Sequence, residues 1–273
     1  MEKKYELTNE TKIVNGKKLR RIRALKDFSD VKAGDLGGFI QKQSNLSHSG
    51  NCWVYGNAIV YENAKLYNDA IVKDQAIVHG NANVLGNSTV CMCATVSDSA
   101  VLYGHSEVYG NACVCGNAII SDLACVCENS RVSENAWVYG DAHLGGNSRV
   151  YGKSKIFGNA VIEHNAEVLE DAWVHGNVCV LDTVTIGGKV SVFENIQLHG
   201  NAVIKSIKDY LIFKNWWSSG RTVVWTRSNN LWQAGCFIGS GEELVAKAYN
   251  DSEISGREYE RIVKYVESIL KGE

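Results

Sequence analysis

Residues 54–71 read VYGNAI-VYENAK-LYNDAI, three copies of the six-residue unit that decides the fold. An aliphatic residue recurs at every sixth position from Val54 to Ile204, without an insertion or a deletion. Four positions after each stands a small residue, Ala or Ser at 21 of 25 places, so chance does not explain the pattern. A turn pair, most often Gly-Asn, lies between the two. A fixed short period indicates a solenoid, and six residues are too few for a helical unit.

Each unit fits one short strand followed by one corner. Side chains alternate along a strand, so the aliphatic residue points inward and its two neighbours point outward. Gly and Asn supply the left-handed backbone that a corner needs. Ala or Ser then fits the cramped inside of the bend. The predicted fold class is therefore an all-β solenoid.

The repeat resembles that of the hexapeptide-repeat left-handed β-helix superfamily, in which three hexapeptides make one triangular coil of 18 residues. The resemblance covers about 150 residues of the chain. It implies left-handed winding and a prism with three flat faces. The family's best-known members are acyltransferases that use acyl-CoA or acyl-carrier protein and commonly assemble as trimers.

The flanking sequence predicts three parts: a hairpin and glycine-rich lead-in at 1–39, the solenoid at 40–204, and a C-terminal module at 205–273. At the N-terminus, strands around 5–8 and 19–25 flank an Asn15-Gly16 turn signal. The module should contain three strands, at 210–213, 222–226 and 231–237, and two helices that begin at Ser240 and Ser255. We expect it to cap the open end of the prism.

Composition excludes several classes of protein. The formal net charge of -2 argues against binding a nucleic acid polymer, which needs clustered positive charge. No apolar run approaches the length of a membrane span, and no signal peptide follows Met1. These features predict a cytoplasmic protein that binds no membrane, with nine cysteines present as thiols.

Sorting the outward residues by an 18-residue period gives three different faces. One face is too apolar to be fully solvated. We interpret it as an interface between copies, and the resemblance implies a homotrimer. A stacking surface for a ring-bearing ligand, or packing against the chain's own termini, is the alternative. The candidate interface residues are Tyr103, Trp137, Tyr139, Phe157, Trp173 and Phe193.

A second face places Arg131 and Arg149 one coil apart, where they could grip an anion or pair with acids such as Glu167. Elsewhere, six cysteines form Cys-x-Cys pairs, and Cys125 lies one coil from His143. A zinc site is conceivable there. No pair has the Cys-x-x-Cys spacing of common zinc modules, however, so we predict no metal and no cofactor.

The C-terminal module concentrates tryptophan and arginine. Indole rings offer stacking surfaces, and guanidinium groups bind phosphate. This combination suits a small anionic, nucleotide-like ligand, while the alternative is that the tryptophans form the module's core. The candidate ligand-binding residues are Trp216, Trp217, Arg221, Arg227 and Asn229.

Three functions stay open. The resemblance alone implies acyl transfer, with His175 as the one candidate base, but the repeat has no interrupting loop to wall off a pocket. The leading interpretation is a non-catalytic oligomeric binder. The whole chain is also similar to uncharacterised phage and prophage hexapeptide-repeat proteins, which suggests sequestration of a nucleotide-like immune signal inside a bacterial host. A structural or assembly role is the third.

Overall fold

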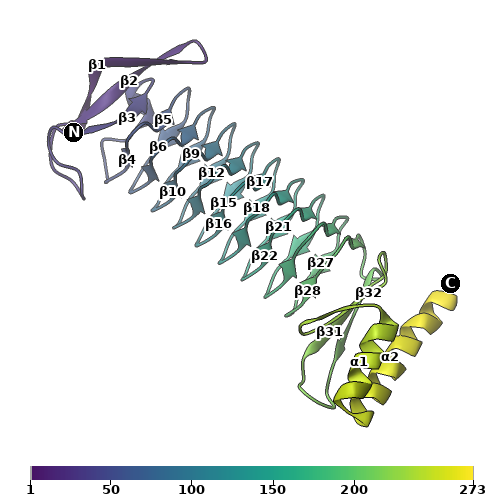
Figure 1. Ribbon diagram of the computed structural model, residues 1–273. Coiled ribbons are helices and arrows are strands. Elements are labelled where there is room, and N and C mark those ends of the chain that lie inside the picture. Colours follow the sequence, from purple (N-terminus) through teal and green to yellow (C-terminus); the bar gives the residue numbers. More distant parts are fainter. Residues whose placement is uncertain (1, 273) are drawn as a thin grey trace.

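The computed structural model describes residues 2–272 and shows an elongated parallel β-solenoid with a hairpin at one end and an α+β module at the other (Figure 1). Consecutive coils pair in parallel with an 18-residue register, as Cys113 with Arg131 and Val126 with Leu144. The inward aliphatic residues and the small residues after each corner are almost all fully buried. The predicted all-β solenoid is confirmed.

The coil strands form three sheets, one on each side of the prism. The hairpin face holds β5 (Ile59–Val60), β8 (Ile77–Val78), β11 (Thr95–Val96), β14 (Cys113–Val114), β17 (Arg131–Val132), β20 (Arg149–Val150), β23 (Glu167–Val168), β26 (Thr185–Ile186) and β29 (Val203–Ile204). The cysteine face holds β4 (Trp53–Val54), β7 (Ile71–Val72), β10 (Thr89–Val90), β13 (Glu107–Val108), β16 (Cys125–Val126), β19 (His143–Leu144), β22 (Val161–Ile162), β25 (Cys179–Val180) and β28 (Gln197–Leu198). The aromatic face holds β6 (Lys65–Leu66), β9 (Asn83–Val84), β12 (Val101–Leu102), β15 (Ile119–Ile120), β18 (Trp137–Val138), β21 (Lys155–Ile156), β24 (Trp173–Val174) and β27 (Ser191–Val192).

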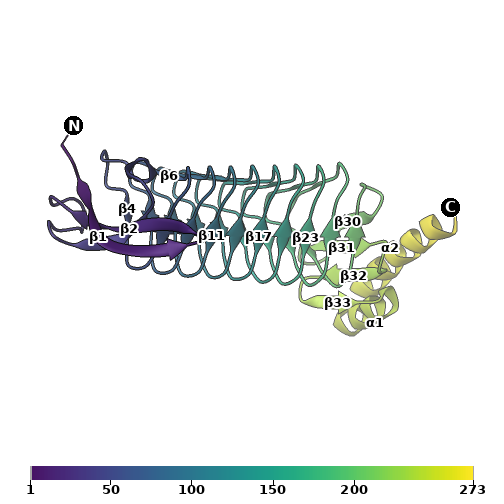
Figure 2. The ribbon, with the colours of Figure 1, turned by 90° about the horizontal axis from the view of Figure 1, so that it is seen from above.

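The N-terminal hairpin continues the hairpin face. Strands β1 (Tyr5–Val14) and β2 (Lys17–Ala24) are antiparallel around the predicted Asn15-Gly16 turn. The glycine-rich lead-in forms β3 (Leu36–Ile40), which pairs antiparallel with β2 and parallel with β5. A 3₁₀ turn, η1 (Gln43–Asn45), follows. In Figure 2 the hairpin lies along the side of the prism over its first coils.

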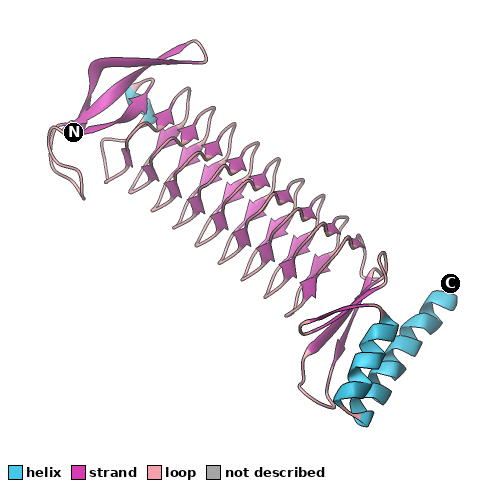
Figure 3. Cartoon of the chain, viewed as in Figure 1, coloured by secondary structure: helices cyan, strands magenta, loops and turns pink. Residues whose placement is uncertain are grey.

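The C-terminal module closes the opposite end with an antiparallel sheet and two helices (Figure 3). Val224 of the sheet belongs to the same buried core as the last coils, with Tyr210 and Ile212 packed against it. The strands are β30 (Tyr210–Lys214), β31 (Thr222–Thr226), β32 (Leu231–Ala234) and β33 (Phe237–Gly239), and the helices are α1 (Gly241–Asp251) and α2 (Glu253–Lys271). No helix among residues 2–272 has both the length and the apolar character needed to cross a bilayer.

Two predictions for this module were wrong. The third expected strand is two strands, because Gly235 adopts a φ of +61° and turns the chain between β32 and β33. The second helix begins earlier, at the N-cap Ser252, whose side chain accepts the Ser255 N–H. Gly256 lies inside this helix, where the Tyr249 ring of α1 occupies the space of a side chain. The first helix has the predicted N-cap at Ser240.

The corners carry a second repeated contact. Where the left-handed corner residue is acidic, its carboxylate accepts the backbone N–H at the same corner of the next coil, as Asp98 does from Gly116 and Asp122 from Gly140. Side-chain amides at the following position bond from coil to coil, for example Asn111 to Asn129 and then Asn147. These contacts satisfy corner donors that the strands leave free.

Asp182 makes this corner contact close to the C-terminal module. Its Oδ2 accepts the Gly200 N–H at 2.8 Å. This hydrogen bond, together with the nearby His199 side chain, holds the pKa of Asp182 below its usual range. A carboxylate whose pKa is lower in the folded state stabilises the fold fully at a pH above its unfolded pKa of ~3.9. This stabilisation is lost as the pH falls through the pKa of the folded state. We expect Asp182→Asn to reduce stability by about 1 kcal/mol at pH 7. The deficit should shrink towards pH ~3.

Thermal unfolding of both proteins between neutral and acidic pH measures this deficit. Glu194→Gln is the matched control, since Glu194 is also an acidic, left-handed corner residue but its carboxylate accepts no hydrogen bond within residues 2–272. An equal loss in the two variants, or a deficit for Asp182→Asn that does not depend on pH, would contradict the role given to the corner carboxylate.

Candidate functional site

A cleft of about 420 Å³ lies where the C-terminal module meets the last coil of the solenoid. One wall comes from the coil around β28. The other comes from the ends of β30 and β31 and from the turn after β32. The coil contributes Asn195, Ile196 and Gln197, and the module contributes Lys214, Gly220, Arg221, Thr222, Val224, Gln233, Gly235 and Cys236.

Two exposed cations line this cleft. Lys214 Nζ donates to Thr222 Oγ1 at 2.9 Å, and Arg221 Nε donates to Ser219 Oγ at 2.7 Å. Both partners are neutral hydroxyls. Across residues 2–272, neither cation forms an ion pair with a carboxylate. Each keeps positive charge and unused N–H donors for an anion.

Gln233 adds a buried polar group to the same wall. Its side chain is 9% exposed, and Nε2 donates to Gln197 Oε1 at 2.9 Å and to Gly235 O at 3.4 Å. The two acceptors fix the orientation of the amide. Its Oε1 is buried and receives no donor within the described chain.

The predicted residues of this module separate in space. Arg221 lines the cleft, whereas Trp216 is 77% exposed outside it and Trp217 packs edge-on against Tyr259 in the module's core. Arg227 Nε donates to Lys208 O, and Asn229 Nδ2 donates to His199 O. Asn229 thus joins the module to the last coil.

Arg131 and Arg149 are paired neighbours on the hairpin face, as their spacing predicted. Arg149 Nη1 lies 3.5 Å from Glu167 Oε1, and neither arginine lines the cleft at the module. Sequence reasoning missed Lys214, Gln197 and Gln233. No repeat or motif marks them, because the cleft forms only when the module docks on the last coil.

The aromatic face carries a continuous stack of rings. Tyr139 stacks on Phe157 at 4.8 Å between centroids, Phe157 on His175 at 4.5 Å, and His175 on Phe193 at 5.4 Å. In the neighbouring column, Lys155 Nζ lies 5.8 Å from the Trp137 ring and 4.5 Å from the Trp173 ring. The strip stays open, with Trp173 43% and Phe193 47% exposed. Tyr103 lies further along the same face and is partly buried.

His175 is the base candidate on this strip. Its Nε2 lies 3.1 Å from Ser191 Oγ, and burial lowers its pKa, so the imidazole is neutral near pH 7. Ser191 also lines a cleft of about 360 Å³ with Asp171, Trp173, Lys189 and Val190. A neutral imidazole beside a cleft can accept a proton. No carboxylate orients it within residues 2–272.

Comparison with known proteins adds one short similarity. No protein-family model matches the chain. A curated protein of Escherichia coli (strain K12), described as the uncharacterized acetyltransferase YdcK, is 51% identical over 37 residues. The match spans 14% of this chain and only 11% of that protein. It is about two coils long, and coils of this kind demand the same residue types at the same positions.

Proposed function

We propose that this protein binds a small anionic ligand in the cleft between the last coil and the C-terminal sheet. The observation that carries the proposal is the pair Lys214 and Arg221, which line the cleft without carboxylate partners.

The ligand class follows from the lining. A volume of about 420 Å³ suits a molecule of nucleotide size. The cations bind phosphate, and the amides of Asn195, Gln197 and Gln233 bind ring edges or hydroxyls. The described lining contains no histidine or carboxylate that could transfer a proton, which favours binding over turnover. A phage protein that sequesters a host nucleotide signal would need to bind the signal without converting it.

The aromatic face is proposed as the contact between copies, in a homotrimer. Trp173 and Phe193 present large apolar surfaces on a flat, rigid sheet, and Lys155 is already covered by indole rings. Burying this apolar surface against a second copy would stabilise the assembly by about 25 cal/mol per Å². In a homotrimer this contact would be heterologous and cyclic, because an isologous contact closes as a dimer.

Ligand binding is tested by calorimetry and thermal shift with AMP, cyclic AMP and pyrophosphate. We expect at least one of these phosphates to raise the melting temperature. Arg221→Ala and Lys214→Ala should each weaken binding about tenfold, because each removes a charge-assisted hydrogen bond. Arg257→Ala is the matched control: it removes the same charge from an exposed pair in α2.

Equal weakening by Arg257→Ala would assign the effect to net charge rather than to the cleft. The absence of any shift with all three phosphates, in protein shown by mass spectrometry to carry no co-purified ligand, would reject the proposal.

The oligomer is tested by light scattering of Trp173→Glu and Phe193→Glu. We expect the mass in solution to fall from that of an assembly to that of one chain, since a carboxylate would be buried without a partner. Met92→Glu is the control, because Met92 is 54% exposed at the corner between β10 and β11, away from the aromatic face. An unchanged mass in the face variants, or an equal fall in the control, would refute the aromatic contact.

Acyl transfer is the second candidate, favoured by the short similarity to a protein described as an acetyltransferase and by the position of His175 beside a cleft. If the chain releases CoA from acetyl-CoA, His175→Ala should lower kcat roughly 10²–10⁴-fold. Arg221→Ala should leave that rate unchanged. Turnover that survives His175→Ala would exclude this base.

A further inference from the structure

We propose that Cys125, Cys127 and His143 form a binding site for a zinc-type divalent cation on the cysteine face. The site lies on the middle of the prism and is independent of the cleft at the module. The spacing of these cysteines along the chain does not predict a metal site, because it lacks the usual Cys-x-x-Cys pattern. The three side chains come together because two adjacent coils lie side by side, not because of their spacing within one coil.

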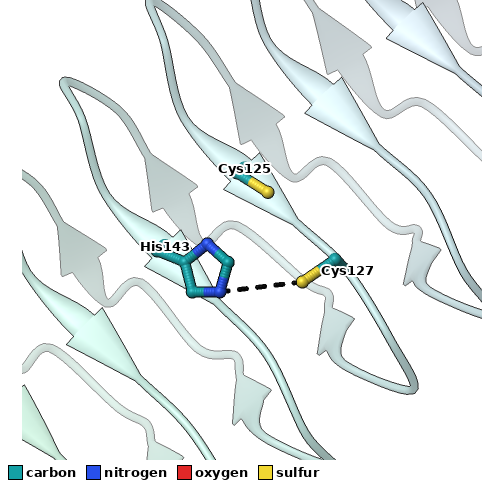
Figure 4. Close-up of side chains that lie close together, drawn as sticks. All are labelled: Cys125, Cys127 and His143. Atoms are coloured by element: carbon teal, nitrogen blue, oxygen red, sulfur yellow. Dashed lines mark hydrogen bonds between the residues drawn. The ribbon is translucent and has the colours of Figure 1, made fainter.

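The fold places the three ligand atoms on two neighbouring strands. Cys125 of β16 pairs in register with His143 of β19, and Cys127 follows on the same outward side because Val126 points inward (Figure 4). The two sulfurs and an imidazole nitrogen all lie within 4.8 Å of one another. Cys127 Sγ and His143 Nε2 are 3.7 Å apart.

These separations suit tetrahedral coordination. With Zn–S of about 2.3 Å and Zn–N of about 2.0 Å, ligand atoms in a tetrahedral site lie roughly 3.5–3.8 Å from one another. The Cys127 to His143 distance already falls in that range, and the remaining ligands need to move by about 1 Å at most. Two thiolates and an imidazole are a ligand set that zinc prefers over harder cations.

Gly145 is an independent observation that favours a bound ion, because it leaves the space beside His143 and Cys127 open. It occupies the outward position next to the cluster, where the neighbouring coils carry Cys127 and Glu163. A Cβ built on Gly145 would lie 3.3 Å from His143 Nε2 and 3.7 Å from Cys127 Sγ. Its φ is not in the left-handed range, so the backbone does not require glycine here. The missing side chain leaves room for an ion and a further ligand.

Neighbouring groups complete the surroundings. One carboxylate lies beside the cluster, with Glu163 Oε1 3.8 Å from His143 Nε2. Three protein ligands with a fourth position held by a carboxylate or water match an open zinc site.

The earlier strand β14 offers a natural comparison. Cys113 and Cys115 form another outward Cys-x-Cys pair, on the hairpin face, but Arg131 stands in register where the histidine would be needed. A cation beside two thiols would repel a metal ion. These two of the three Cys-x-Cys pairs thus differ in their neighbour in register, which is a histidine for Cys125 and an arginine for Cys113.

The experiment uses the full chain, reduced and freed of metal, titrated without oxygen with Zn²⁺ and with Co²⁺ as the spectroscopic probe. We expect one equivalent per chain, an intense cobalt–thiolate absorption, the visible bands of tetrahedral cobalt and a raised melting temperature. Cys125→Ser, Cys127→Ser and His143→Ala should each abolish the thiolate band or weaken binding at least ~100-fold. Cys113→Ser combined with Cys115→Ser should bind like the parent.

Gly145→Val tests the site without touching a ligand. It should weaken cobalt binding roughly tenfold by filling the open space. Gly187→Val, a glycine on the hairpin face that also lacks a left-handed φ, is its control. Circular dichroism of each variant confirms the fold. The proposal is overturned if no thiolate band forms, if Cys125→Ser or His143→Ala binds cobalt as tightly as the parent, or if the Cys113 and Cys115 variant loses the band as well.

Discussion

Parallel pairing in an unbroken 18-residue register is the constraint on which the rest of the structure depends. Each coil donates its strand N–H groups to carbonyls of the next, as Cys125 N to Ala142 O and Arg131 N to Ser148 O. An inserted residue that is not looped out at a corner would turn the side chains of its strand inside out, because side chains alternate with a period of two. The aliphatic residues can line one dry core only while this register holds from Val54 to Ile204.

The same register makes columns of outward side chains and so determines what each face can do. Residues 18 apart lie side by side, which stacks Tyr139, Phe157 and His175 into one strip and sets Cys125 against His143. The corner carboxylates and side-chain amides add bonds in the same direction. Side chains on such a scaffold are held at fixed spacing, which favours preformed sites over induced ones.

The interior of the solenoid could be predicted from the sequence, because the aliphatic residue and the small residue of every six-residue unit point inward. The sheet assignments and the columns followed from counting by 18, including the Cys125 to His143 neighbourhood. The cleft could not be predicted, since Lys214 and Gln233 meet Gln197 only through the docking of the module. The turn at Gly235 and the earlier start of α2 depend on tertiary contacts, such as the Tyr249 ring over Gly256.

The two candidate functions make different demands on assembly. The cleft at the module takes all its walls from one chain, so anion binding there needs no second copy. His175 lies instead on an open strip beside a shallow cleft, and the described coils have no loop that covers it. Because acyl transfer needs water excluded from the reacting groups, the missing wall would have to come from another copy packed on the aromatic face. Catalysis at His175 is therefore tied to oligomerisation, whereas binding beside Arg221 is not.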